Sequence, residues 1–416
     1  PLRAEDIARN ITGWCDRSVA ANSMASRLTA LIDPATDRAR DGAIEVTGPL
    51  TVRLSLSVPD IALIANFSDY PAAVTHESYT GGDIFENGIG TGPYRPVSLV
   101  VGESCVLERI TERPWWGTEI YGGPYLDRIE FHDRGTDPVS WIAAAEAEEV
   151  DLLYETIGDF VDIMDTIGWT KSETRSTATV VLRANQTATV DGATPYADVR
   201  VRRALALAVD NAILLELGYG DHGELAANHH VSPMHPEYAD IGMPETDPDK
   251  ALALMTEAGL ETFEHELITI DDDWQRNTGD AAAAQMRDAG LTVRRRILPG
   301  ATFWQGWTTF PLSATQWNHR PLGIQILTLA YHSAAAWNES GYANPDFDAL
   351  LERANAIADA EERQEVTRQL ETMLREDGVI IQPFWRRLYT HHVPGLVGAQ
   401  KHPSHEIHLY KIGFAS

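Results

Sequence analysis

Two consecutive units between residues 246 and 298 have the same order of helix, glycine and strand. The first, "TDPDKALALMTEAGL" (246–260), places Asp247 as a helix N-cap and Gly259 at the helix end, and the strand-like "HELITI" follows. The second, "GDAAAAQMRDAGL" (279–291), leads into the strand-like "TVRRRIL". Helix and strand in repeated alternation are typical of a parallel sheet covered by helices. The sequence therefore predicts an α/β fold.

Periodicity elsewhere in the chain predicts further helices and strands. Helices are expected over residues 1–32, 138–149, 197–220, 345–357 and 359–377, and strands over 42–59 (two, around a Gly-Pro turn), 87–110, 179–186 and 378–385. "DDDW" (271–274) lacks the spacing of a calcium loop and is expected to be a polar loop. No low-complexity linker occurs, so the domains are expected to be joined by strands that cross between them.

Length and charge exclude several classes of protein. The chain has 416 residues, which is too many for one ordinary core, so two or three domains are expected. Its 61 acidic residues outnumber 33 lysines and arginines and give a net charge of −28, which repels phosphate backbones and anionic membranes. No run approaches the roughly 18 apolar residues of a membrane span. We therefore expect neither a nucleic-acid partner nor a membrane span.

The cysteines and the first residues indicate whether the chain has a disulfide and whether sequence precedes it. Cys15 and Cys105 are too few for a disulfide scaffold, and neither lies in a CxxC pair. A single bridge and two free thiols both stay open, because the sequence gives no Cα distance, and we favour free thiols. The chain has no initiator methionine and no signal peptide, and "PLRAEDIARNI" already looks like the start of a helix. We expect that preceding sequence is missing.

Motifs for catalysis and for cofactor or metal binding are absent from the sequence. G-x-S-x-G, S-x-x-K and HExxH do not occur, and "GIGTGP" (88–93) lacks the Lys-Ser/Thr of a phosphate loop, so it is expected to be a structural turn. His402, His405 and His408 are three residues apart, which suits a metal only on a helix, whereas "HEIHLY" looks like a strand. We expect no cofactor, no metal and no enzymatic activity.

Seven segments occur in the order found in a known family and span nearly the whole chain. They are "LRAEDIARNI" (2–11), "GTGPY" (90–94), "LERITERPWWGTEIYGGPYLDRIEF" (107–131), "AAAEAEEVDLL" (143–153), "PYADVRVRRALALAVD" (195–210), "TDPDKALALMTEAGL" (246–260) and "NPDFDALLERA" (344–354). Together they resemble the extracellular solute-binding proteins of family 5, the dipeptide, oligopeptide and nickel binding components of bacterial ABC importers. The N-terminal strands that the family carries before the first segment are absent here.

The resemblance implies a two-lobed periplasmic-binding-protein fold of type II, in the large class with an extra subdomain, with the ligand cleft between the lobes. Residues 1–88 would form the small subdomain of lobe I, 89–182 together with 385–416 its core, and 183–384 lobe II. The chain would cross the hinge near "LRANQ" and near "QPFWRR". Binding would then be closure of the hinge around a buried ligand.

The resemblance also implies a function. It indicates a monomeric protein that delivers a small solute to the membrane permease of an ABC importer. The protein would lie in the periplasm or, as the alternative, outside the cell and anchored to the membrane. The ligand classes that stay open are peptide-like, opine-like, sugar and other polar or anionic compounds. Two alternatives remain: a non-transport binding protein on the same fold, such as a chemoreceptor partner or a peptide holder, and a hydrolase, for which the sequence names no residues.

"TQWNHR" (315–320) falls where dipeptide and oligopeptide binders show "G-W-x-x-D-Y-x-D-P". Trp317 is kept, but the acidic residues, one of which holds the peptide ammonium in dipeptide binders, are replaced by Asn318, His319 and Arg320. A guanidinium suits a carboxylate, a phosphate or a stacked ring. We therefore expect an anionic or polyhydroxylated small molecule in place of a peptide with a free amine.

Four more residues are candidates for ligand contact through the resemblance. "ATFWQGW" (301–307) matches a family helix in which Trp304 is expected to be buried and Trp307 to face the cleft. Trp337 and Asn338 precede a helix start, and cleft and packing roles stay open for both. Asn185, at the hinge, is expected to contact the ligand through its amide.

Overall fold

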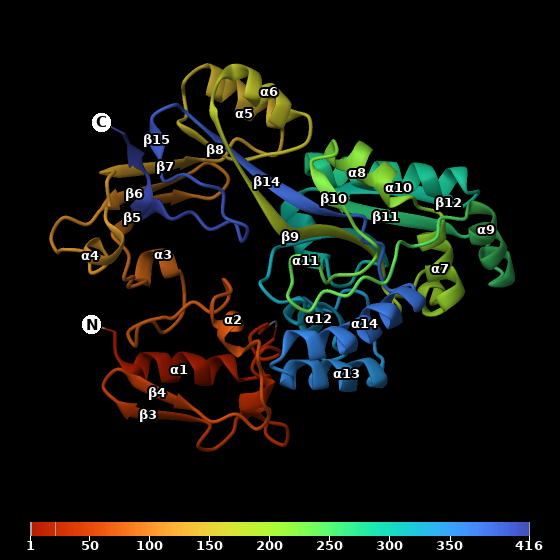
Figure 1. Cartoon of the computed structure of the whole chain (residues 1–416), viewed down its shortest axis with the longest axis horizontal. Helices are drawn as coiled ribbons and strands as arrows, with labels where there is room; N and C mark the ends of the chain where they lie inside the picture. The colour runs from red at the N-terminus through yellow and green to blue at the C-terminus, as the bar shows by residue number, and fades with distance from the viewer. Residues whose placement is uncertain (1, 21, 416) are drawn as a thin grey trace.

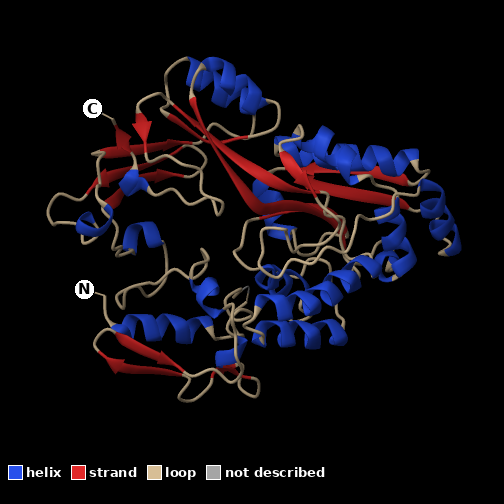
Figure 2. Ribbon diagram, viewed as in Figure 1, coloured by secondary structure: helices blue, strands red, loops and turns tan. Residues whose placement is uncertain are grey.

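A computed structural model describes residues 2–20 and 22–415. They form two lobes that share one continuous sheet (Figures 1 and 2). We call lobe II the part on the right of Figure 1, built around β11–β13, and lobe I the part at the upper left, built around β5–β8. The N-terminal segment (residues 2–88) lies below lobe I and beside lobe II. This arrangement agrees with the expected α/β architecture.

Lobe II is a mixed sheet between two layers of helices (Figure 2). The strand order of the shared sheet is β10-β14-β9-β13-β11-β12, and β8 pairs with β14. As predicted, β11 and β12 are parallel. The strands are β9 (Thr170–Ala184), β10 (Gly223–Leu225), β11 (Glu264–Ile270), β12 (Thr292–Leu298), β13 (Leu312–Trp317) and β14 (Phe384–His392). The helices are α7 (Val199–Leu207), α8 (Asn211–Tyr219), α9 (Pro248–Glu257), α10 (Asp273–Asp288), α11 (Gly300–Gly306), α12 (Gly323–Tyr331), α13 (Pro345–Ala356) and α14 (Ala360–Glu376).

Strand β9 shows why both faces of this sheet are covered. Its last nine residues are buried without interruption, as in strands that are covered on both faces. Val180 and Leu182 pack in the cluster that includes α7, α8 and α10. Val181, which points to the opposite face, packs with α12, α13 and α14. The strand therefore anchors two cores at once.

Lobe I and the N-terminal segment contain smaller sheets. In lobe I, three strands form the order β5-β6-β7, and β15 pairs with β16. Its elements are β5 (Tyr94–Val100), β6 (Ser104–Arg109), α4 (Thr118–Tyr121), β7 (Arg128–His132), α5 (Pro138–Glu146), β8 (Leu152–Thr156), α6 (Phe160–Ile167), β15 (Leu396–Val397) and β16 (Gly413–Phe414). The N-terminal segment holds α1 (Ala4–Trp14), β1 (Ile32–Asp33), β2 (Arg38–Ala39), β3 (Ile44–Gly48), β4 (Thr51–Leu54), α2 (Leu63–Phe67) and α3 (Ile84–Asn87). Short 3-10 helices lie at Thr29–Leu31, Pro195–Ala197 and Leu409–Lys411.

Strands β9 and β14 are the two connections between the lobes. The start of β9 pairs with β14, which also pairs with β8 of lobe I, and the end of β9 pairs with β13 of lobe II. The β9–β14 register shifts where Trp385 faces Thr179 and Arg387 faces Arg175, which is a β-bulge. The chain therefore crosses twice in paired strands, as expected. The division at 1–88, 89–182, 183–384 and 385–416 remains a prediction.

Several predicted elements differ from those in the structure. The single helix expected over 197–220 is two helices, because Asp210 caps α8 by accepting a hydrogen bond from the amide of Ala212 at 2.8 Å. "DDDW" is not a loop throughout, since α10 begins at Asp273. The strand expected over 378–385 begins only at Phe384.

One prediction for the C-terminal segment is wrong, and the prediction for the cysteines is confirmed. "HEIHLY" does not form a strand; it is a loop that leads into the 3-10 helix at Leu409–Lys411. Cys15 and Cys105 are free thiols, which is the favoured alternative. Cys15 is buried in the core of the N-terminal segment, and burial raises the pKa of its thiol to about 11.

Candidate functional site

A cavity lined by aromatic side chains lies between the N-terminal segment and lobe II. Its volume is about 330 Å³, which is at the small end of ligand pockets in proteins. We call it the aromatic pocket. The residues that line it are Tyr70, Trp304, Trp307, Gln316, Trp317, Asn318, Arg320 and Trp337. Tyr70 belongs to the N-terminal segment and the other seven to lobe II, so the pocket is complete only where the two parts meet.

Trp317 ends strand β13, and a buried carboxylate fixes its ring. The indole Nε1 donates to Oε1 of Glu339 at 3.0 Å, and the Thr315 hydroxyl donates to Oε2 at 2.6 Å. Arg183 on β9 forms an ion pair with the same carboxylate, and its guanidinium lies 5.3 Å from the centre of the Trp317 ring. Burial raises the pKa of Glu339, against the opposing effect of Arg183. Hydrogen bonds and charge thus orient this wall of the pocket.

The tryptophans of the pocket pack edge to face. Trp307, Trp317 and Trp337 have ring centres 6.1–6.4 Å apart and interplanar angles of 63–72°. Trp304 contacts Trp307 from one turn earlier on α11, with ring centres 5.9 Å apart. Tyr70 stacks on Trp337 at 6.2 Å and 20°. The pocket can therefore offer ring faces and edges to a flat or cyclic solute.

Two arginines share one carboxylate at the wall of the pocket. Oδ2 of Asp69 accepts from Nε of Arg320 at 3.1 Å. The same oxygen forms ion pairs with Nη2 of Arg320 at 3.0 Å and with Nη1 of Arg27 at 2.9 Å. We call these three residues the arginine cluster. Burial, together with the charge of Arg320, lowers the pKa of Arg27 to about 10, although Asp69 opposes the shift. The guanidinium of Arg27 is therefore charged at neutral pH. The cluster joins the N-terminal segment to lobe II.

The structure places the other predicted residues of "TQWNHR" in different roles. Asn318 lines the pocket, and its carbonyl accepts from Nη1 of Arg320 at 3.0 Å. His319 is not among the lining residues; its Nδ1 accepts from the backbone N–H of Thr177 on β9 at 3.1 Å. Burial lowers the pKa of His319 to about 4, so the ring is neutral at pH 7. His319 lies where the strands cross between the lobes.

The amides of Asn185 and Asn338 are used within the fold. Oδ1 of Asn185 accepts from the backbone N–H of Thr187 at 3.0 Å, and Nδ2 of Asn338 donates to the carbonyl of Tyr342 at 2.7 Å. Neither asparagine lines the aromatic pocket, whereas Trp337 does. Ligand contact by the eight residues named from the sequence remains a prediction. The structure brings five of them together: Trp307, Trp317, Asn318, Arg320 and Trp337.

Sequence reasoning missed some residues of the pocket. Trp304 was expected to be buried, which is wrong, because the side chain is 41% exposed and lines the pocket. Its spacing of three from Trp307 on a helix was the available signal. Tyr70, Asp69 and Arg27 lie about 250 or more residues before Arg320 in the chain, and no local pattern connects them to it.

A larger cavity, of about 750 Å³, lies mainly in lobe I. It is lined along β7 and β8, and it reaches Asp272, Trp274 and Gln316 of lobe II. Gln316 also lines the aromatic pocket, so the two cavities adjoin. Arg386 of β14 is buried beside it, pairs with Glu155 and lies over the Trp274 ring at 4.0 Å. The space between the lobes is thus longer than the aromatic pocket alone.

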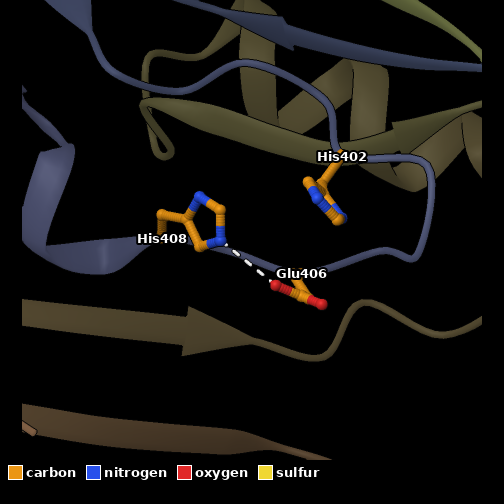
Figure 3. A group of neighbouring side chains, drawn as sticks. All are labelled: His402, Glu406 and His408. Carbon is orange, nitrogen blue, oxygen red and sulfur yellow. Dashed lines mark hydrogen bonds and ion pairs between the residues drawn. The ribbon is translucent and has the colours of Figure 1, made fainter. Parts of the chain in front are cut away.

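One group of side chains has the types and spacing of a metal site (Figure 3). Ligand atoms of His402, Glu406 and His408 lie within 4.8 Å of one another. However, Nδ1 of His402 accepts from the N–H of Ser404 at 3.3 Å, and Nδ1 of His408 lies 3.2 Å from the Lys411 ammonium. Both rings then carry the proton on Nε2, and His408 donates it to Glu406 at 3.1 Å. A metal would have to displace these hydrogen bonds, so we assign none.

Comparison with known proteins shows which family the chain matches. Residues 1–338 match the bacterial extracellular solute-binding proteins, family 5. No curated protein matches the sequence. Among solved structures, OppA from Haemophilus influenzae in complex with the peptide RPPGFSPFR is similar at a TM-score of 0.86 and 18% identity. AppA from Bacillus subtilis with a nonapeptide gives 0.84 and 18%, and AgaA from A. tumefaciens R10 with agropinic acid gives 0.83 and 17%.

The similarity extends over both lobes, since each of the three alignments covers 100% of this chain and 84% of the other. The two-lobed fold of periplasmic binding proteins is therefore confirmed. Among the residues that the structure describes, no helix is long and apolar enough to cross a membrane. The family match covers more than three quarters of the sequence, and the fold and the pocket between its parts agree with it. The chain belongs to the bacterial extracellular solute-binding proteins of family 5.

Proposed function

We propose that this solute-binding protein is the periplasmic component of an ABC importer, that it works as a monomer, and that it holds one small solute in the aromatic pocket. The partner would be the membrane permease of the importer. Family membership supports the solute-binding role. The periplasmic location, the monomeric state, the permease partner and the binding site are our proposals for this chain.

The observation that supports the site is the composition of the pocket. Tyr70 comes from the N-terminal segment and the tryptophans from lobe II, and Asp69 and Arg320 form an ion pair across the same boundary. A solute in this position would contact both parts and favour their contact, because a ligand stabilises the conformation that binds it best. Bending at the β9–β14 bulge would open the pocket for entry and release.

The solved relatives support a polar organic solute. OppA and AppA hold peptides and AgaA holds agropinic acid. In this chain the residues that follow Trp317 are Asn318, His319 and Arg320. None of them carries a carboxylate, so a peptide ammonium would lack its partner there. We propose a solute without a free amine at this position.

We propose no enzymatic activity. A binding protein of this family needs only to close around its ligand and to release it. The polar groups that line the aromatic pocket are amides, a phenol and a guanidinium, which are poor nucleophiles. Nothing in the part of the chain that the structure describes favours the alternatives of a chemoreceptor partner, a peptide holder or a hydrolase.

The proposed site is tested by native mass spectrometry and by titration. Protein purified from cell extract should retain a solute of one defined mass, and that solute should bind one-to-one in isothermal titration. Trp337→Ala removes a wall of the pocket and should weaken binding by at least about tenfold, since indoles in well-packed sites commonly contribute 2 kcal/mol or more, roughly. Trp116→Ala is the matched control, because Trp116 is exposed on lobe I. Equal affinity of the two variants would exclude the aromatic pocket.

A further inference from the structure

The charges of the arginine cluster do not balance. Arg27 and Arg320 each carry one positive charge, and Asp69 supplies one negative charge between them. The side chains of Arg27 and Arg320 are 1% and 5% exposed, so solvent screens them little. An unpaired buried charge is costly, which is why such charges are normally matched within hydrogen-bond distance. The cluster therefore carries one positive charge in excess.

Two other buried arginines of lobe II each have a carboxylate partner, and a third, Arg202, donates to the backbone carbonyls of Tyr196, Ala197 and Asp377. Arg183 pairs with Glu339, and Arg363 pairs with Glu237 at 3.4 Å. Arg27 and Arg320 thus differ from these arginines in sharing a single carboxylate. Arg27 also has donor atoms that are not used. Among the described residues, its Nε and Nη2 have no hydrogen-bond partner.

Arg320 has donors that the protein does not use. A guanidinium has five N–H groups. In Arg320, Nε donates to Asp69, Nη2 forms an ion pair with the same carboxylate oxygen at 3.0 Å, and Nη1 donates to the carbonyl of Asn318. Two N–H groups remain, on a residue that lines the aromatic pocket. An anionic group in the pocket would accept these donors and leave Asp69 to balance Arg27.

Most of the remaining lining is aromatic. Four indoles and one phenol surround the cavity, and the remaining lining side chains besides Arg320 are the amides of Gln316 and Asn318. No carboxylate is among these lining residues, so a cationic solute would find no counter-charge in the lining and would lie beside the positive cluster. Indole faces bind flat or cyclic groups through stacking and dispersion.

We propose that the solute is a ring compound with a single anionic group, which rests on the solute-binding function proposed above: the anion pairs with Arg320 and the ring lies against Trp317 and Trp337. Aromatic acids and sugar acids share this chemistry. The volume of about 330 Å³ accommodates one such ring. The second guanidinium, Arg27, acts through Asp69 as a positioning residue.

The test uses probes that share a ring and differ in the charge of one substituent. Benzoate, benzamide and benzylamine carry the same ring with a negative, a neutral and a positive group, and glucuronate and glucose repeat the comparison for a sugar ring. Tryptophan fluorescence and isothermal titration of the 416-residue chain should show binding of benzoate or glucuronate. Benzamide, benzylamine and glucose should bind at least about tenfold more weakly, which corresponds to about 1.4 kcal/mol.

Variants at the cluster separate charge from folding. Arg27→Gln removes the excess charge and should weaken binding of the anionic probe by about tenfold or more, whereas Arg27→Lys keeps the charge and should largely restore it. Arg17→Gln is the matched control, since it makes the same change in net charge on the same segment, at a partly exposed pair with Asp37. Equal binding by the Arg27→Gln and Arg17→Gln proteins would overturn the role of Arg27.

The outcomes also separate this inference from the proposed function. A neutral or cationic probe that binds as tightly as its acid overturns the anionic class, and so does a neutral or cationic solute found by native mass spectrometry. Both results leave a bound solute and therefore the solute-binding function. If none of the five probes binds, the charge and ring content of the co-purified solute decides the inference. A protein that holds no solute in either experiment overturns the proposed site itself.

Discussion

Glu339→Gln tests the buried network behind the aromatic pocket. The carboxylate of Glu339 pairs with Arg183, accepts from Trp317 and Thr315, and is shielded from solvent, with Arg183 and Glu339 at 1% and 2% exposed. The substitution keeps the shape and an acceptor oxygen but leaves the guanidinium of Arg183 without a counter-charge. Breaking one side of a buried pair costs about 3–5 kcal/mol.

This energy converts into a measurable shift of the melting temperature. An unfolding entropy of about 2.1 cal/mol/K per residue gives about 0.9 kcal/mol/K for 416 residues. The Tm should therefore fall by about 3–6 °C in differential scanning calorimetry. Glu406→Gln is the control, since Glu406 lies in the exposed His402 cluster with its side chain 51% exposed, and its Tm should change by less than about 1 °C.

A double variant makes the reasoning refutable. Arg183→Met with Glu339→Gln removes both charges and still offers an oxygen to the indole of Trp317, so most of the lost stability should return, because uncharged packing often replaces a buried pair at little cost. A Tm loss equal to the sum of the two single variants would show that the residues are not coupled. A Glu339→Gln protein that melts like the Glu406→Gln control would refute the buried charge as the cause.

Three further predictions concern other parts of the fold. Asp210→Ala removes the cap of α8 and should cost about 1 kcal/mol in urea unfolding. Cys15, whose pKa burial raises to about 11, should react with a thiol reagent at pH 8 only when the protein unfolds, whereas the half-buried Cys105 should react in the folded protein. Burial lowers the pKa of His265 to about 4, and an unfolded histidine titrates near about 6.5. The unfolded chain thus binds more protons between these values, stability falls as the pH falls from about 6.5 to about 4, and His265→Gln should flatten this loss.

Each of these three predictions can be contradicted by a specific result. An unchanged urea midpoint for Asp210→Ala would show that α8 is held by packing alone. Fast labelling of Cys15 in the folded state would indicate local opening of the N-terminal segment. An equal loss of Tm on acidification in the His265→Gln protein and the wild type would assign the acid sensitivity to other buried groups, such as His405, whose pKa burial lowers to about 4.

The sequence was most informative where local rules agree with the fold. In α9, Asp247 caps the helix by accepting from the amide of Lys250 at 2.9 Å, and Gly259 ends it at φ +70°. Both residues were recognisable because caps and left-handed glycines act within a few positions of the helix end. The single helix expected over 197–220 failed for the same kind of reason, since Asp210 is a cap that the apolar periodicity concealed.

The candidate site was only partly predictable. Trp317 stood out because it is kept from a family pattern, and Asn318 and Arg320 stood out because they follow it in place of the acidic residues of that pattern. Asp69 and Arg27 could not be predicted as part of the site, because their ion-pair cluster with Arg320 forms only when the N-terminal segment folds onto lobe II. The roles of Asn185 and His319 depend on hydrogen bonds to Thr187 and Thr177, and a sequence does not show whether an amide or an imidazole is already engaged by the backbone.

The paired crossing of β9 and β14 also limits how the lobes can move. A ribbon of two hydrogen-bonded strands bends at a bulge, but it resists sliding, because a shift of one residue would turn every side chain to the opposite face. Opening and closing should therefore follow one path, without slippage between the two halves. After each release of solute, Tyr70 and Trp337 would return to the same facing positions, so the protein would begin every transport cycle with its recognition surface in the same alignment.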